Sequence, residues 1–461
     1  MTILAAVAVP HPPVIFPEVG KGREQGIIKT IESYREVMKF VATFKPDTIV
    51  LTTPHSELYG DYFHVAGGSG ATGEFARFGA PQVKVHADYD NEFVSVLENV
   101  CKERDFPCGT LGERDPSLDH GSLIPLRFLN EAWQNYKVVR IGLSGLSLLK
   151  HYQLGQIIRE VSEKLGRRTV FVASGDLSHR LLDEGPYGFN PEGPVFDKRI
   201  TTALDTGNFA DLFQFKPSFC EAAGECGHRS FIIMAGALDG KAVKSKLLSY
   251  EGPFGVGYGV AKFEIGEDDK NRLFGKQYEE LLQKEMAERR SKEDSFVSWA
   301  RQCVETFVST GKPVDFRKDL PAELMDNRAG VFVTLKKNGN LRGCIGTIEP
   351  VRENIAWEIW HNAISACSKD YRFTPVRPDE LAEITYSVDV LTSPVPVTDI
   401  NALNPKVDGI IVQSGMKRGL LLPDIEGVDT LAQQIAICRQ KGGIATNDPV
   451  QLFQFKVIRH H

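Results

Sequence analysis

The first part of the chain alternates between two hydrophobic patterns. Short runs rich in β-branched residues, typical of buried strands, occur at Ile3–Val9, Thr48–Thr53, Lys137–Gly142, Thr169–Ser174 and Val256–Phe263. Between them, apolar residues recur at helical spacing in segments such as Ile27–Phe44, Asn91–Lys102 and Leu154–Leu165. The alternation predicts an α/β layer structure with a largely parallel or mixed sheet over residues 1–263. In such sheets, chemistry is found in the loops just past the carboxyl ends of the strands.

The pattern changes after residue 263. Residues 264–295 are dense in charge and poor in β-branched residues, which predicts a solvated helical linker. Over residues 296–461 strand-like runs predominate in a less regular order, which favours a smaller α+β domain. The predicted strands are Gly330–Leu335, Leu341–Thr347, Ala382–Leu391 and Gly409–Ser414, and the predicted helices are Phe296–Ser309, Asn354–Ser368 and Val428–Lys441.

Composition narrows the classes of partner. With 42% hydrophobic residues, 25% charged residues and a net charge of -6, the chain is typical of a globular protein without a polybasic surface. We therefore expect no nucleic-acid partner. No apolar run approaches the roughly 20 residues that span a bilayer. The first apolar run lacks a basic leader and stops at Pro10. It predicts a β-strand, and a cytoplasmic protein without a membrane partner is expected.

Four histidines stand where strand ends are predicted: His11, His55, His120 and His179. A proline next to His11 and another next to His55 stiffen the loops, which suits a metal ligand. Neutral imidazole is the commonest transition-metal ligand in proteins. From the residues alone, a shared metal site and four separate structural histidines remain alternatives. Three further histidines lack such a context and are expected at the surface: His64, His86 and His151.

The segments that hold these histidines carry a family resemblance. The motifs HPP at 11–13, PHS at 54–56, DHG at 119–121 and SGDLSH at 174–179 together resemble the LigB-like superfamily, which includes class III extradiol dioxygenases and Memo proteins. The resemblance implies a LigB-like α/β domain with a central mixed sheet flanked by helices. It also implies non-haem Fe(II) held by two histidines, His11 and His55, and by one glutamate. His179 would be the base that takes a catechol proton, and His120 an acid or a hydrogen-bond donor to oxygen.

The third metal ligand has two candidates in adjacent positions. Glu225 lies where the dioxygenases keep their glutamate, whereas CGHR at 226–229 resembles the Cys-Gly-Arg-His of the Memo family with its last two residues exchanged. A carboxylate suits Fe(II) that binds catecholate and O₂, while the thiolate of Cys226 favours copper or zinc and is itself oxidisable. Both residues are kept as metal ligands, with Fe(II) expected and copper or zinc as alternatives. Asp176 is either a partner that orients an imidazole or a helix N-cap.

The second domain is marked by the hexapeptide LRGCIG at 341–346. This hexapeptide resembles the signature of the AMMECR family, and the resemblance extends from about residue 296 to residue 461. It implies a smaller α+β AMMECR-like domain but no settled reaction. Cys344 is either a nucleophile, with Arg342 as an anion anchor, or an inert residue of the core.

Two functions from different classes follow from these resemblances. The first is a metal-dependent oxidoreductase of the extradiol dioxygenase type, which acts on a small aromatic diol with O₂. The second is a Memo-like metal-binding or redox module without ring cleavage. It would work with a radical SAM protein, because the fusion resembles the AmmeMemoRadiSam systems. The oligomeric state, a homo-oligomer included, is left open by the sequence.

Overall fold

The computed structural model describes residues 3–337, 339–425 and 427–461, and it divides into two compact units. The first unit ends at Leu281 and the second begins at Leu282. This boundary falls inside helix α9 (Phe274–Lys292), which is the helical part of the charged segment. The beginning of that segment is not helical, because Glu264 to Asp268 continue a strand of the first unit.

A six-stranded mixed sheet forms the centre of the first unit. Four strands are parallel, and two antiparallel strands complete one edge. In spatial order the strands are β7 (Lys137–Gly142), β2 (Thr48–Thr53), β8 (Thr169–Ser174), β1 (Ile3–Val9), β10 (Tyr258–Asp268) and β9 (Lys241–Glu251). The predicted mixed α/β architecture is therefore confirmed, and the carboxyl ends of β1, β2 and β8 lie next to one another.

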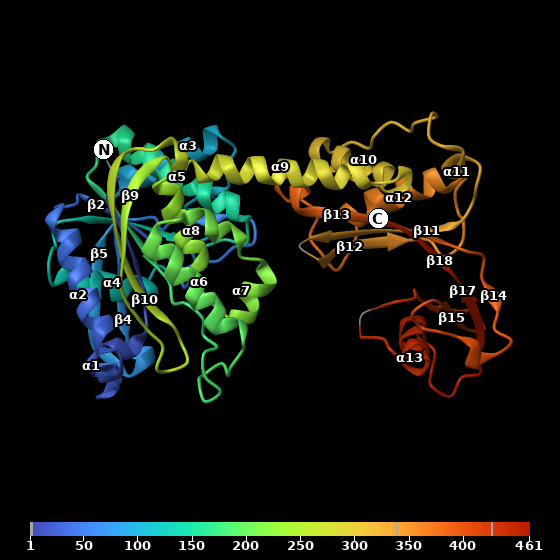
Figure 1. Ribbon diagram of the computed structural model, residues 1–461, viewed down its shortest axis with the longest axis horizontal. Helices are drawn as coiled ribbons and strands as arrows, with labels where there is room; N and C mark the ends of the chain where they lie inside the picture. The colour runs from blue at the N-terminus through green and yellow to red at the C-terminus, as the bar shows by residue number, and fades with distance from the viewer. Residues whose placement is uncertain (1–2, 338, 426) are drawn as a thin grey trace. The chain divides into compact units, whose positions relative to one another are not determined.

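Helices cover both faces of this sheet (Figure 1). One face packs against α2 (Ile28–Thr43) and α4 (His120–Asn130). The other packs against α3 (Asn91–Glu103), α5 (Leu148–Leu165), α6 (Glu192–Thr206) and α8 (His228–Ala237). Successive residues of a strand enter opposite cores, since Val7 faces α2 while Ala8 faces α5. Burial on both faces explains why the strand runs are apolar without interruption.

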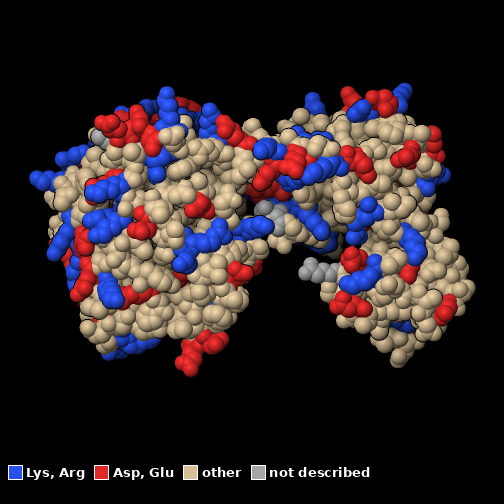
Figure 2. Space-filling model, in the orientation of Figure 1, with Lys and Arg blue, Asp and Glu red and all other residues tan. Residues whose placement is uncertain are grey.

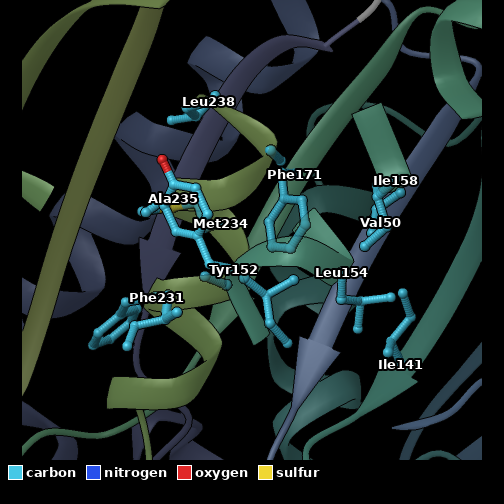
Figure 3. Packing of buried hydrophobic residues seen from close by; sticks show 14 of the residues in the cluster. Val50, Ile141, Tyr152, Leu154, Ile158, Phe171, Phe231, Met234, Ala235 and Leu238 are labelled. Atoms are coloured by element: carbon cyan, nitrogen blue, oxygen red, sulfur yellow. The ribbon is translucent and has the colours of Figure 1, made fainter. Parts of the chain in front are cut away.

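Helices α5 and α8 cross so closely that their backbones touch. A Cβ atom on Gly155 would lie 2.0 Å from the carbonyl oxygen of Ile233, and one on Gly236 would lie 1.9 Å from that of Tyr152. Figure 3 shows Tyr152 of α5 beside Met234 of α8 in the same core. The crossing fixes α8 against the sheet, and with it the loop that precedes α8.

Smaller elements complete the first unit. They are the strands β3 (Phe63–His64), β4 (Gly70–Phe75), β5 (Ala80–Asp88) and β6 (Cys108–Gly109), and the helices α1 (Pro17–Gly20) and α7 (Pro217–Ala223).

The second unit contains two four-stranded antiparallel sheets, as expected for an α+β domain. The first has the order β12 (Asn340–Gly346), β11 (Gly330–Lys337), β13 (Ile384–Leu391) and β18 (Val457–His460). Its apolar face packs on α10 (Ser295–Thr310), α11 (Ala322–Met325) and α12 (Ile355–Ser368). The second has the order β14 (Val395–Pro396), β17 (Gln451–Phe455), β15 (Gly409–Ser414) and β16 (Lys417–Leu421), with α13 (Leu431–Gly442) packed on β16.

Charges of both signs are interspersed over the face of each unit seen in Figure 2. Among the described residues, no helix is both long and apolar enough to cross a bilayer.

Candidate metal centre

His11 lies directly after β1 and is held on two sides. Its backbone N–H donates to Asp176 Oδ1 at 2.7 Å, and its Nδ1 lies 2.9 Å from Ser174 Oγ. The Ser174 hydroxyl donates its proton to the carbonyl oxygen of Gly121 at 2.6 Å, so it can only accept from the imidazole. The proton of neutral His11 is therefore on Nδ1, and its Nε2 carries the lone pair that a metal ligand needs.

The unprotonated nitrogen of His11 faces two other potential ligand atoms. His55 Nε2 lies 3.0 Å from His11 Nε2, and Cys226 Sγ lies 3.5 Å from the same atom. All three donor atoms lie within 4.8 Å of one another. His11 is buried, Cys226 is half-buried and His55 is exposed, so the group is reached from one side. The structure thus brings together three of the four predicted metal ligands.

Cys226 reaches this position because two loops touch. A Cβ atom on Gly175 would lie 2.2 Å from Cα of Gly227, so the loop after β8 and the start of α8 are in backbone contact. The contact lets the backbone N–H of Asp176 donate to Cys226 Sγ at 3.3 Å. Burial raises the pKa of the Cys226 thiol well above its usual value. Ionisation of this thiol therefore needs a cation close by, which a metal ion provides.

The two predicted catalytic histidines lie beside this group. His120 is the first residue of α4, and its ring stacks on that of His55 with centroids 4.1 Å apart. The Nε2 atom of His179 is buried and has no hydrogen-bond partner among the described residues. Burial lowers the pKa of each of these imidazoles to about 4. Both are therefore neutral near pH 7 and able to accept a proton.

Glu225 belongs to a different group. Its Oε2 accepts the backbone N–H of His228 at 2.7 Å, and its carboxyl lies with Cys220 and the His228 imidazole rather than with His11 and His55. Burial raises the pKa of Glu225 to about 7. Its role as a metal ligand stays a prediction.

Sequence reasoning missed some of these polar groups. Ser174 sets the tautomer of His11, and its position at the end of β8, inside the SGDLSH motif, is the signal that could have found it. The prediction of surface positions for His64 and His151 was wrong, because their side chains are buried. His151 shares the apolar face of α5 with Leu154 and Ile158, a helical spacing that the sequence carried. His86 is exposed, as expected.

The chemistry of the donor set fits a transition metal. Two imidazole nitrogens and one sulfur converge, and one of the imidazoles is oriented by a hydroxyl group behind it. The site is accessible at the exposed His55, where an external ligand can approach.

Comparison with known proteins agrees with the two-unit architecture. The family described as "Catalytic LigB subunit of aromatic ring-opening dioxygenase" matches residues 5–261, and the AMMECR1 family matches residues 297–460. A protein of Clostridium acetobutylicum is 39% identical over 477 residues, which cover 100% of this chain and 99% of that protein. A Thermotoga maritima protein is 49% identical over 170 residues, 36% of this chain and 98% of its own length. The crystal structure of an uncharacterized Pyrococcus horikoshii protein has 30% identity and a TM-score of 0.32, covering 36% of this chain and 88% of its own.

These findings define the class as fusions of a dioxygenase-like α/β unit with a smaller α+β unit. The chain belongs to the LigB family through its first unit and carries an AMMECR1 unit after it.

Proposed function

We propose that the first unit binds one transition-metal ion through His11, His55 and Cys226 and acts as a metal-dependent oxidoreductase. The observation that carries the proposal is the convergence of His11 Nε2, His55 Nε2 and Cys226 Sγ within 4.8 Å. Membership of the LigB family makes Fe(II) the expected metal. Because sulfur is a ligand that copper and zinc favour, these two metals are the alternatives, and elemental analysis distinguishes them from iron. When bound, a redox-active metal would bring an aromatic diol and O₂ together.

The residues around the group have distinct roles in this proposal. His179 Nε2 is buried and unpartnered among the described residues, so it is available to take a proton from a hydroxyl of the substrate. His120 stacks on His55 and presents a neutral imidazole on the accessible side. The Asp176 carboxyl accepts the backbone N–H of His11, and the Asp176 backbone N–H donates to Cys226 Sγ. The proposed substrate is therefore a small aromatic diol, bound between His179 and His120.

A second candidate function is favoured by one observation, the sulfur in the donor set. The dioxygenases that the sequence resembles use a carboxylate as their third ligand, whereas the Glu225 carboxyl lies in another group. A thiol beside a redox metal is itself open to oxidation, which suits a redox or metal-binding module better than a turnover enzyme. Such a module would serve a partner, and we propose a radical SAM protein for that role.

The test is metal analysis of anaerobically purified protein, coupled to O₂ uptake with a panel of catechols. Cys226→Ser should lose most of the metal, while Glu225→Gln and the matched cysteine variant Cys220→Ser should keep it. Loss of metal in Glu225→Gln with retention in Cys226→Ser would overturn the proposed ligand set. Catechol-dependent O₂ uptake would support the oxidoreductase. Stoichiometric metal without O₂ uptake would favour the second candidate.

A further inference from the structure

The second unit contains a partly open cavity with a volume of about 1110 Å³. One wall is the sheet of β11, β12 and β13, and a second is β16 with the segment after it, including Leu420 and Leu422. The end of α9 and part of α10 line the cavity as well. Small-molecule sites in proteins have volumes of roughly 300–1,000 Å³ and are lined mostly by apolar groups with a few placed polar ones. The cavity is therefore of the size and kind that holds an organic molecule.

The register of the strands places Cys344 on the wall of this cavity. Cys344 of β12 is opposite Thr334 of β11, which is opposite Ser387 of β13. Residues opposite one another share a face, and this face lies away from the core formed with α10 and α12. Cys344 is accordingly half-buried at the cavity, with Sγ 3.2 Å from Thr334 Oγ1, and is not a residue of the apolar core.

Two arginines line the same cavity as Cys344. Arg372 donates through Nη2 to the carbonyl oxygen of Cys344 at 3.1 Å, and Asp370 accepts the Cys344 N–H at 2.9 Å. On the neighbouring row of the sheet, Arg459 forms a bidentate pair with Asp389. In both guanidinium groups the Nη1 atom has no hydrogen-bond partner among the described residues. Each arginine is thus held in place by a carboxylate while one of its donor edges remains available.

The lining as a whole carries an excess of positive charge. Eight lysine or arginine residues line the cavity against four aspartate or glutamate residues. Lys336 and Lys441 are among the eight, and neither has a carboxylate partner in the described part of the chain. Because the walls have a low dielectric constant, an excess of one sign is felt more strongly inside such a cavity than on an open surface.

We propose that this cavity binds a small organic anion, with its carboxylate or phosphate group on Arg372 and Arg459 beside Cys344. The apolar part of the ligand lies against Leu420 and Leu422. The proposal concerns the second unit alone and does not depend on the metal centre of the first.

Alkylation of Cys344 in the full chain measures the electrostatic part of the proposal. Peptide mass spectrometry follows the alkylation of Cys344 by iodoacetate and by iodoacetamide in low-salt buffer. Both reagents react with the thiolate, so the ratio of the two rates does not depend on how much of Cys344 is ionised. Arg459→Gln and the double variant Lys336→Gln, Lys441→Gln should each lower this ratio at least about threefold. The control Arg317→Gln removes a surface guanidinium that pairs with Asp319 outside the cavity, and it should leave the ratio unchanged. An equal ratio in all variants would overturn the proposal.

Isothermal titration tests binding without relying on the thiol. The probes are phenyl phosphate and benzoate, with benzamide as the neutral analogue. Binding of an anionic probe that weakens about tenfold in Arg459→Gln, but not in Arg317→Gln, supports the proposal, and the preferred probe identifies phosphate or carboxylate chemistry. Equal binding of benzamide, or no binding of either anion at millimolar concentration, would overturn it.

Discussion

Gly175 and Gly227 touch through their backbones, with only 2.2 Å between Cα of Gly227 and the place where a Cβ of residue 175 would stand. This approach sets the distance from the loop after β8 to the start of α8. It therefore decides whether the sulfur of Cys226 reaches the nitrogen of His11.

Gly175→Ala should separate the two loops. The added methyl group forces a backbone shift, which we expect to cost about 1–3 kcal/mol of unfolding free energy. Because the shift moves Cys226 from His11, metal affinity should fall as well. Chemical denaturation and metal titration measure the two effects. Gly67→Ala is the control, since its Cβ would meet Thr110 only at 3.5 Å, an ordinary contact. Unchanged metal affinity in Gly175→Ala would show that Cys226 does not bind the metal.

Ser174→Ala should weaken metal binding through the His11 imidazole. The change removes the acceptor for His11 Nδ1–H, so the ring loses both its orientation and its fixed tautomer. Loss of such a partner behind a metal ligand lowers metal affinity by about 10–100-fold. Ser162→Ala removes another buried hydroxyl, one that bonds to Thr169, and controls for loss of stability. If both variants bind metal equally well, the tautomer argument is wrong.

His179→Ala should separate proton transfer from metal binding. Its Nε2 has no partner among the described residues, so its removal should leave the metal content intact. If His179 is the base, catechol-dependent O₂ uptake should fall about 100-fold or more. Elemental analysis and an oxygen electrode measure the two quantities. His86→Ala, at an exposed histidine of β5, should change neither. Full activity in His179→Ala would remove this residue from the mechanism.

Glu380 should make the second unit sensitive to acid. Burial raises the pKa of its carboxyl, but hydrogen bonds from Arg342 and the Arg377 backbone, and the charge of Lys337, outweigh burial and lower the pKa to about 2. A depressed folded-state pKa gives stability that is complete above the unfolded value of 4.5 and is lost as the pH falls towards 2.

Glu380→Gln should therefore destabilise the protein by about 2 kcal/mol at pH 7, because the Arg342 guanidinium is left without its carboxylate. The difference from the wild type should shrink between pH 4.5 and pH 2, as the wild-type carboxyl also becomes neutral. Urea denaturation at a series of pH values measures it. Glu323→Gln, at an exposed glutamate, should match the wild type throughout. A difference that does not change with pH would exclude the charged pair as the cause.

Much of the fold could be predicted from local pattern. The strand runs ending at Val9, Thr53 and Ser174 are apolar throughout because helices bury both faces of the sheet, and this leaves a strong signal. The predicted helical linker began too early, because Glu264 to Asp268 are charged but extend strand β10, and helix α9 begins only at Phe274. His64 and His151 were misplaced for a related reason. Their polar residue type predicted exposure, although their positions in the fold bury them.

The sequence by itself placed His11, His55 and His179 just after apolar strands, and parallel strands bring their carboxyl ends to one edge of a sheet. It did not determine that the four histidines share a site, because His120 begins helix α4 instead of ending a strand. It did not determine which of the neighbours Glu225 and Cys226 would face His11, or that Cys344 would line a cavity instead of the core. Adjacent residues point in different directions according to the path of the backbone. That path is fixed here by contacts between segments distant in the sequence: Gly175 against Gly227 in the first unit, and one sheet facing another in the second. Such contacts depend on packing at the scale of single methyl groups, which local sequence patterns do not encode.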